Sequence, residues 1–321
     1  MMRRCLLALT WLLCVSVPAQ QVSLVFAGDT TLDDDAGALI ERGGDPLAAF
    51  APLFAEADIR MANLECVVAT TGEAGSKNYT FRAHPRVLPV LRRHLDGVTL
   101  ANNHSGDFGR VAFAEMLTLL RQNGLAQAGG GMNLAEAHTP WIIERKGLRI
   151  ALLSYNEFMP RSFEALHDAA GSAWSEDEQV VADIHRARNV HRADVVIPFM
   201  HWGWENERTA NARQRLLARK MIEAGADAVV GGHPHVTQDI EHHQGKPIVY
   251  SVGNFVMKET DNEAQRQAWV LRLQLDKQGV QAFDTHVVRI DMRGIPTPDP
   301  RTASPCWKRG QTQVDQCLPG P

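Results

Sequence analysis

The sequence lacks the excess of basic residues that a nucleic-acid-binding protein carries. It contains 33 Lys and Arg residues against 37 Asp and Glu residues, for a formal net charge of −4. Because a basic surface is the electrostatic footprint of DNA and RNA binders, the composition excludes nucleic acid as an expected partner. Beyond the first twenty residues, the sequence also lacks any apolar run near the roughly 20 residues of a membrane span. We therefore expect a soluble mature protein without a transmembrane anchor.

Internal repeats and long polar linkers are also absent from the interior of the sequence. A chain of 321 residues can bury a large core, and nothing in its interior marks a boundary between two domains. From about Arg293 onward, proline, glycine and charged residues become frequent. We expect one domain over residues 20–296 and a C-terminal tail over residues 297–321, poorly ordered or tied by a disulfide.

The N-terminus has the pattern of a secretory signal peptide. Arg3 and Arg4 precede a short apolar run, which ends at Val17-Pro18-Ala19. This pattern predicts a signal peptide over residues 1–19, cleaved after Ala19, and a periplasmic or secreted protein. Two alternatives stay open: an uncleaved anchor, for which the run is short, and a lipid anchor at Cys14, for which the preceding Leu13 is bulky.

Cysteine is scarce, and only Cys66, Cys306 and Cys317 lie after the predicted cleavage point. Export places these cysteines in an oxidising compartment, where disulfides persist. We expect Cys306 and Cys317 to pair within the tail. Cys66 precedes Val67 and Val68, which favours a small buried hydrophobic residue over a reactive thiol.

Apolar strand candidates alternate with amphipathic helix candidates along the sequence. This order is typical of an α/β fold with a largely parallel sheet. Ser175 to Glu178 has the spacing of a capping box at a helix start. The expected strands are 22–27, 59–62, 98–101, 148–153, 195–200, 226–230, 248–252 and a closing pair at 269–275 and 281–290; the expected helices are 47–54, 108–122, 175–191 and 211–224.

The most informative motif is Gly231-Gly232-His233-Pro234-His235, which follows the apolar run 226–230. Open α/β sheets bind ligands at the carboxyl ends of their strands. If the chain stays extended, His233 and His235 point the same way, and Pro234 stiffens that geometry. Two imidazoles held in this way suit a transition-metal ion, although a histidine-containing turn is an equally simple interpretation.

The same layout, an apolar strand followed by polar residues, recurs four more times. Each occurrence has a purely structural alternative: a cap, a polar strand end, a turn or a core histidine. Asp107 is most simply explained as the cap of the following helix, and Glu205 as a carboxylate that orients His201. Taken together, carboxylates, an asparagine and histidines at strand ends match metal-assisted hydrolysis with one or two ions. The residues of the four clusters are Asp29; Asn63 and Glu65; Asn102, Asn103 and His104; and His201 with Glu205.

In this order, the motifs resemble the CapA capsule-synthesis family, a branch of the calcineurin-like metallophosphoesterases. The resemblance covers about residues 22–296. It rests on Gly28-Asp29, Asn63-Leu64-Glu65, Asn102-Asn103-His104-Ser105-Gly106-Asp107-Phe108-Gly109, His201-Trp202-Gly203-Trp204-Glu205, Gly232-His233-Pro234-His235 and Tyr250-Ser251-Val252-Gly253-Asn254-Phe255.

The resemblance implies a four-layer α-β-β-α sandwich of the metallophosphoesterase type around a site for divalent ions of the Mn, Zn or Fe kind. It implies that Asp29 and His235 hold a first ion, that Glu65 bridges, and that Asn103, His201 and His233 hold a second ion. His104 would be the general acid. The residues expected to support these ligands or to contact substrate are Asn63, Asn102, Asp107, Glu205 and Asn254.

The chain departs from the superfamily pattern at two positions. Thr31 stands where the Asp-x-His motif has its histidine, and Glu65 replaces a bridging aspartate. The first ion could therefore be weakly held, replaced or absent. We expect an exported metal-dependent hydrolase that acts on a phosphoester or an anionic polymer, together with capsule-synthesis machinery. The alternative is a non-hydrolytic accessory protein that binds a polymer such as poly-γ-glutamate.

Overall fold

The computed structural model describes residues 21–159, 161–258 and 262–318. The predicted signal peptide, residues 1–19, lies outside these residues. Among the helices of the described chain, none is both long and apolar enough to cross a membrane.

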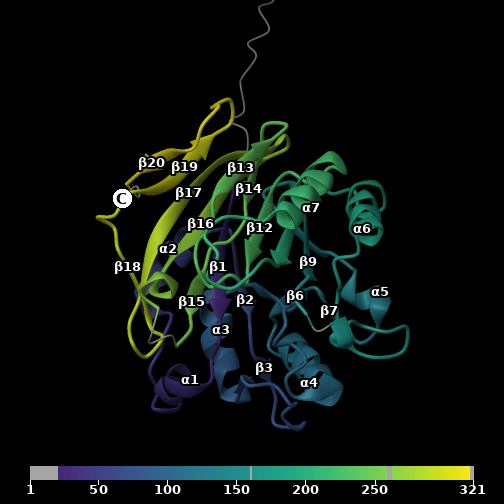
Figure 1. The fold of residues 1–321 in the computed structure, drawn as a ribbon, viewed down its shortest axis with the longest axis vertical. Coiled ribbons are helices and arrows are strands. Elements are labelled where there is room, and N and C mark those ends of the chain that lie inside the picture. The colour runs from purple at the N-terminus through teal and green to yellow at the C-terminus, as the bar shows by residue number, and fades with distance from the viewer. Residues whose placement is uncertain (1–20, 160, 259–261, 319–321) are drawn as a thin grey trace, which may run out of the picture.

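The first sheet has ten strands, and those from its centre to one edge run parallel (Figure 1). Its main order is β20-β19-β17-β16-β1-β2-β5-β6, with β15 beside β1 and β18 beside β17. Strand β1 runs parallel to β2 and β15 but antiparallel to β16. The strands are β1 (Val22–Thr30), β2 (Ile59–Leu64), β5 (Gly97–Thr99), β6 (Ala126–Ala128), β15 (Asn254–Val256), β16 (Gln267–Asp276), β17 (Gly279–Ile290), β18 (Pro296–Pro298), β19 (Ser304–Lys308) and β20 (Asp315–Cys317).

The second sheet has six strands in the order β13-β14-β12-β11-β9-β8. Its four inner strands are parallel, and an antiparallel hairpin closes each edge. The strands are β8 (Trp141–Arg145), β9 (Leu148–Asn156), β11 (Val195–His201), β12 (Val229–Gly232), β13 (Ile240–His243) and β14 (Lys246–Val249). Two short pairs complete the described strands: β3 (Val67–Val68) with β4 (Arg82–Ala83), and β7 (Gly130–Gly131) with β10 (Gly171–Ser172).

Helices cover the outer face of each sheet (Figure 1). The α-helices are α1 (Asp34–Glu41), α2 (Ala51–Glu56), α3 (Leu88–His94), α4 (Gly109–Gln122), α5 (Leu134–Ala137), α6 (Asp177–Asn189) and α7 (Ala212–Glu223). Short 3₁₀ turns are η1 (Ala48–Phe50), η2 (Pro85–Val87), η3 (Arg161–Phe163) and η4 (Glu263–Arg266).

The alternation of side chains along β1 explains the layers. Leu24 and Phe26 belong to the apolar cluster between the two sheets, while Val25 and Ala27 belong to the cluster beneath α1 to α4. The Phe26 ring stacks on Phe199 of the second sheet, with 6.1 Å between ring centroids. A third cluster joins the outer face of the second sheet to α6 and α7. Three apolar layers between helix, sheet, sheet and helix form the predicted four-layer α-β-β-α sandwich.

The residues predicted as a C-terminal tail take part in the first sheet. Strand β19 pairs with β17, and Trp307 is buried in the cluster between the sheets. Of the two predicted states of this segment, the disulfide-tied one is present, because Cys306 and Cys317 are bonded. Cys66 is buried, as predicted, and burial raises its thiol pKa above the usual range.

Two predicted helix caps are wrong. Among the described residues, no side chain caps the first turn of α6, and Ser175 Oγ donates to Glu157 Oε2 at 2.9 Å instead. Asp107 is likewise no cap of α4, since its carboxylate is used elsewhere. A capping box does occur at α7, where Asn211 and Gln214 bond reciprocally. The sequence spacing alone did not distinguish these cases, because Ser and Asp have other partners once the fold is complete.

Candidate metal centre

The candidate site lies where the carboxyl ends of parallel strands from both sheets meet. Asp29 is on β1, and Glu65 directly follows β2. His201 ends β11, and His233 directly follows β12. A close approach of the backbone fixes this meeting point, because a Cβ added to Gly28 would lie 1.9 Å from the carbonyl oxygen of Gly253. Only glycine permits β1 and the segment before β15 to lie so close.

Two carboxylates lie at the centre, and both are fully buried. Asp29 is held on both oxygens: Oδ1 accepts from Asn63 Nδ2 at 2.8 Å, and Oδ2 accepts from the backbone N–H of His233 at 3.0 Å. Among the described residues, neither carboxylate oxygen of Glu65 has a hydrogen-bond partner. A buried carboxylate without a partner is costly, so these oxygens call for a cation.

Three histidines surround these carboxylates. His201 Nε2 lies 3.3 Å from Glu65 Oε1, 2.6 Å from Asn103 Oδ1 and 3.1 Å from His233 Nδ1. His233 Nε2 is buried and has no partner within the described chain. His235 Nδ1 lies 2.8 Å from Asn254 Oδ1. The three imidazoles therefore lie around Glu65, and His233 Nε2 is available to bind a metal ion.

The backbone at these two histidines forms a turn, which is one of the two geometries that the sequence left open, and does not continue the strand. Strand β12 ends at Gly232, and both His233 (φ 93°) and His235 (φ 58°) adopt the left-handed region. Each such residue costs roughly 1–3 kcal/mol, and strain of this kind concentrates at functional sites. The turn nevertheless brings both rings to Glu65.

Two groups of ligand atoms are close enough to hold an ion: Asp29, Glu65 and His201, and Glu65, His233 and His235, with all atoms of each group within 4.8 Å of one another. Carboxylate and imidazole ligands suit Zn²⁺ and similar divalent ions, so the residues present fit the implied metal. Glu65 belongs to both groups, as a bridging ligand would. The groups place His233 and His235 together, whereas the resemblance assigns them to different ions.

The protonation states of Glu65 and His233 support the same use, whereas the pKa of Asp29 is shifted towards its neutral form. Burial raises the pKa of Glu65, but the imidazoles of His201 and His235 outweigh it and lower the pKa to about 2. Burial, helped by His201, lowers the pKa of His233 well below its usual value. Burial and the charge of Glu65 raise the pKa of Asp29. Glu65 is therefore anionic and His233 neutral at pH 7, which are the protonation states that bind metals.

His104 has a fixed partner next to this centre. Its Nδ1 lies 2.7 Å from Oδ2 of Asp107, a fully buried carboxylate. Asp107 also accepts from the backbone N–H of Phe81 at 2.9 Å and from Lys77 Nζ at 2.8 Å. Asp107 thus orients His104, which is a different role from the predicted helix cap.

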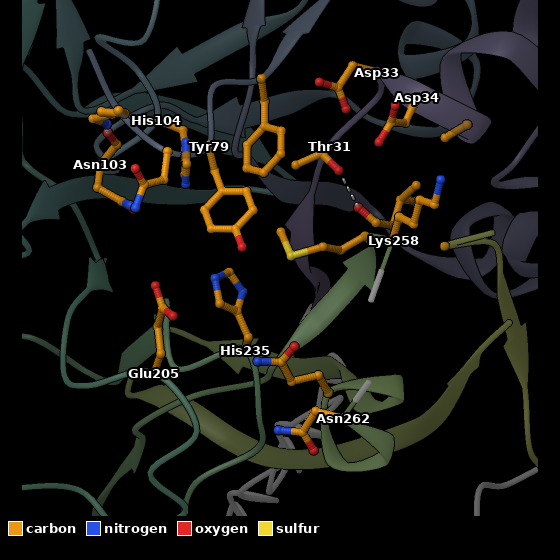
Figure 2. Close-up of a pocket in the computed structure, with 18 of the residues that line it drawn as sticks. Thr31, Asp33, Asp34, Tyr79, Asn103, His104, Glu205, His235, Lys258 and Asn262 are labelled. Atoms are coloured by element: carbon orange, nitrogen blue, oxygen red, sulfur yellow. Dashed lines mark hydrogen bonds between the residues drawn. The ribbon is translucent and has the colours of Figure 1, made fainter. Parts of the chain in front are cut away.

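A pocket of about 770 Å³ opens beside the centre (Figure 2). Asn103, His104 and His235 line it, so the candidate proton donor and part of the ligand set face the same space. Glu205 also lines the pocket but is exposed, and the amide of Asn63, not Glu205, approaches His201 Nδ1, at 3.3 Å. The predicted orienting role of Glu205 is wrong, and contact with substrate is the role left open to it.

Comparison with known proteins identifies the family. Residues 23–259 match the family described as "Bacterial capsule synthesis protein PGA_cap". The chain belongs to this family. It is 30% identical to "PGA biosynthesis protein CapA" of Bacillus subtilis (strain 168) over 285 residues, which cover 87% of this chain and 73% of that protein. It is 29% identical to "Capsule biosynthesis protein CapA" of Bacillus anthracis, over 63% of this chain and 49% of that protein.

Solved structures share the fold. A hypothetical protein from Thermus thermophilus aligns with a TM-score of 0.52 and 16% identity, over 83% of this chain and 98% of that one. A 5'-nucleotidase precursor from the same organism aligns with a TM-score of 0.54 and 14% identity, over 87% of this chain and 56% of that one. The four-layer arrangement is thus the metallophosphoesterase-type fold, as predicted.

Several residues of the site have no signal in the sequence. Lys77 and Tyr79 line the pocket, although neither follows an apolar strand. Phe158 also lines it and lies two residues after β9, a strand end that was not recognised as part of the site. Thr31 also lines it, and its Oγ1 donates to the carbonyl oxygen of Val256 at 3.3 Å (Figure 2). The Thr31 hydroxyl therefore supports the adjoining strand β15.

Proposed function

We propose that this chain is an exported, metal-dependent hydrolase of capsule metabolism in the cell envelope. Its substrate would be a phosphoester, or another ester or amide of an anionic polymer. The observation that carries the proposal is the buried Glu65 carboxylate, which lacks a hydrogen-bond partner among the described residues and lies within reach of three imidazoles. Such a carboxylate is stabilised by a divalent cation.

The residues that would hold one or two ions are Asp29, Glu65, His201, His233 and His235, with Asn103 beside His201. A divalent ion bound there supplies Lewis acidity and a more acidic water molecule. His104 would give a proton to the leaving oxygen, because it faces the pocket and its Nδ1 is held by Asp107. The Asp107 carboxylate holds Nδ1 and leaves Nε2 as the nitrogen that transfers the proton.

The test is metal content and turnover of the purified mature protein. We expect at least one Mn²⁺, Zn²⁺ or Fe²⁺ per chain and hydrolysis of bis(4-nitrophenyl) phosphate. His104→Ala should lower the turnover number by about 10²- to 10⁴-fold while metal content stays the same. The matched control is His167→Ala, since His167 is exposed and outside the pocket. A protein that retains no metal, or a His104→Ala variant with an unchanged rate, would contradict the proposal.

A second candidate function is a non-hydrolytic accessory protein that binds a poly-γ-glutamate-like polymer through a metal ion. Thr31 favours it, because the first-motif histidine is absent and the Thr31 hydroxyl is already bonded to Val256. In this case the polymer would bind without being cleaved, and binding would disappear after chelation or in His233→Ala. Binding that survives both treatments would exclude the metal-bridged form.

A further inference from the structure

Tyr79 is an exposed aromatic residue inside the pocket. Its relative exposure is 73%, and it lies in the segment between β3 and β4. Figure 2 shows its ring projecting into the pocket beside His104, with the hydroxyl directed towards His235. Full burial of such a side chain would stabilise the folded protein by roughly 1.5–3 kcal/mol. Because Tyr79 is mostly exposed, it contributes little of this stabilisation.

The segment that presents Tyr79 is held at both sides of the residue. Lys77 Nζ donates to Asp107 Oδ1 at 2.8 Å, and the backbone N–H of Phe81 donates to Asp107 Oδ2 at 2.9 Å. The carboxylate that orients His104 therefore also anchors the chain two residues before and two residues after Tyr79. The position of Tyr79 is fixed relative to His104 even though its own side chain has little packing.

The surroundings of Tyr79 have an apolar side as well. Phe81 packs on His104, with 4.5 Å between ring centroids, and Phe158 and Met159 line the same pocket. Met159 is 64% exposed, so this wall also has apolar surface open to a ligand. A pocket with an aromatic face and apolar neighbours favours a ring-shaped ligand group.

We propose that Tyr79 contacts the leaving group of the substrate, and that this group contains a ring with an apolar face. The inference rests on the proposed function, since it uses His104 as the donor to the leaving oxygen. A leaving group protonated by His104 lies next to Tyr79, because Asp107 holds His104 and also anchors the chain on both sides of Tyr79. The ring would stack on Tyr79 while the anionic centre faces the metal ligands.

The test is calorimetric titration of the full mature protein, saturated with Mn²⁺, with phenylphosphonate and with methylphosphonate. The two probes share the anionic head and differ in the ring. Tyr79→Ala should weaken phenylphosphonate binding by about two- to tenfold, in line with the roughly 0.5–1.5 kcal/mol of an aromatic pair, and should leave methylphosphonate within about twofold. Tyr79→Phe, the matched control, should retain both affinities. An equal effect on both probes, or none on phenylphosphonate, would overturn the inference.

Glucose 1-phosphate, titrated in the same way, distinguishes a sugar ring from an aromatic one. Tyr79-dependent binding of glucose 1-phosphate as well as phenylphosphonate would assign the site to saccharides, and binding of phenylphosphonate alone would assign it to aromatic groups. The failure of this inference differs from failure of the proposed function. Hydrolysis that depends on His104, with no ring-specific effect of Tyr79→Ala, would overturn only the inference. Ring-specific binding without any hydrolysis would overturn the hydrolase, and with it the assignment of the ring to a leaving group, while Tyr79 would remain a ring-binding residue.

Discussion

Asn102 Nδ2 donates to Asn63 Oδ1 over 3.1 Å, and the direction of this bond is fixed by the backbone. Asn102 Oδ1 accepts from the backbone N–H of His104, so its amide nitrogen must face Asn63. Asn63 Oδ1 also accepts from Thr99, which leaves Asn63 Nδ2 to face Asp29 and His201. Two asparagines thus connect the turn that carries the candidate proton donor to two candidate metal ligands.

Replacing Asn63 should therefore weaken metal binding. Asn63→Leu keeps a similar size but removes the donor to Asp29 Oδ1, so the carboxylate is held on one oxygen only, by the backbone N–H of His233. Removing a hydrogen-bond partner of a metal ligand typically weakens metal affinity by about 10- to 100-fold, and we expect a loss of metal affinity in that range. The measurement is titration of the metal-free protein with Co²⁺, followed by visible absorption. Thr99→Val is the control and should stay within about threefold, because Asn102 still holds Asn63 Oδ1.

Asp107→Asn should lower turnover without removing metal. The uncharged amide would hold the Nδ1–H of His104 less firmly, so the turnover number for bis(4-nitrophenyl) phosphate should fall by about 10²-fold. Metal content, measured by elemental analysis, should match that of the natural protein. Asp168→Asn, at an exposed position, is the control. A parallel loss of metal and activity would argue for a general collapse of the site.

Asp33 should make stability depend on pH in a predictable direction. Burial and the neighbouring Asp34 raise its pKa from 3.8 to about 6. The native state then binds this proton more tightly than the unfolded state, so the stabilisation is complete below about pH 4 and is lost as pH rises through about 6. The melting temperature of Asp33→Asn should therefore rise relative to that of the natural protein as the pH increases from 4 to 7. Thermal unfolding in EDTA across this range measures both temperatures. A difference between them that does not change with pH would contradict the prediction.

The Cys306–Cys317 disulfide should stabilise the edge of the ten-stranded sheet. It joins residues 11 apart. Closing a loop of this length lowers the conformational entropy of the unfolded chain and so stabilises the folded state by about 3 kcal/mol. Dithiothreitol should lower the free energy of unfolding in urea by roughly that amount. The double variant Cys306→Ser/Cys317→Ser should already be destabilised and should not respond to the reductant. An equal response of both proteins would assign the effect to another cause.

The strand-end ligands could be predicted from the sequence because parallel strands end at one edge of a sheet. Asp29, Glu65, His201, His233 and His235 follow apolar runs, and the fold brings all five together. The pairing of these residues could not be predicted, since it depends on how the two sheets pack and on the left-handed turn at His233 and His235. The alternation of apolar and polar residues within a strand predicts neither the packing of the two sheets nor this turn.

Other parts of the site were ambiguous for local reasons. Asp107 precedes a helix, where a cap is the usual explanation, and only the folded chain shows its bonds to His104 and Phe81. Tyr79 lies in a polar segment with no periodicity, so no sequence pattern marks it. In the six-stranded sheet, β9 and β14 were predicted, but the edge strands β8 and β13 that pair with them were not, since both are short and end in charged residues or histidines.

The pairing of β1 with β16 has a consequence for shortened versions of the chain. The family match ends at residue 259, whereas β16, β17 and β19 lie after it and complete the sheet on that side of β1. A chain cut at residue 259 would leave the backbone of residues 22–26 as an open edge and would remove β16 side chains such as Leu271 and Leu273 from the cluster that contains Leu24 and Phe26. Open apolar edges pair with other molecules, so such a fragment should aggregate even though it retains every candidate metal ligand.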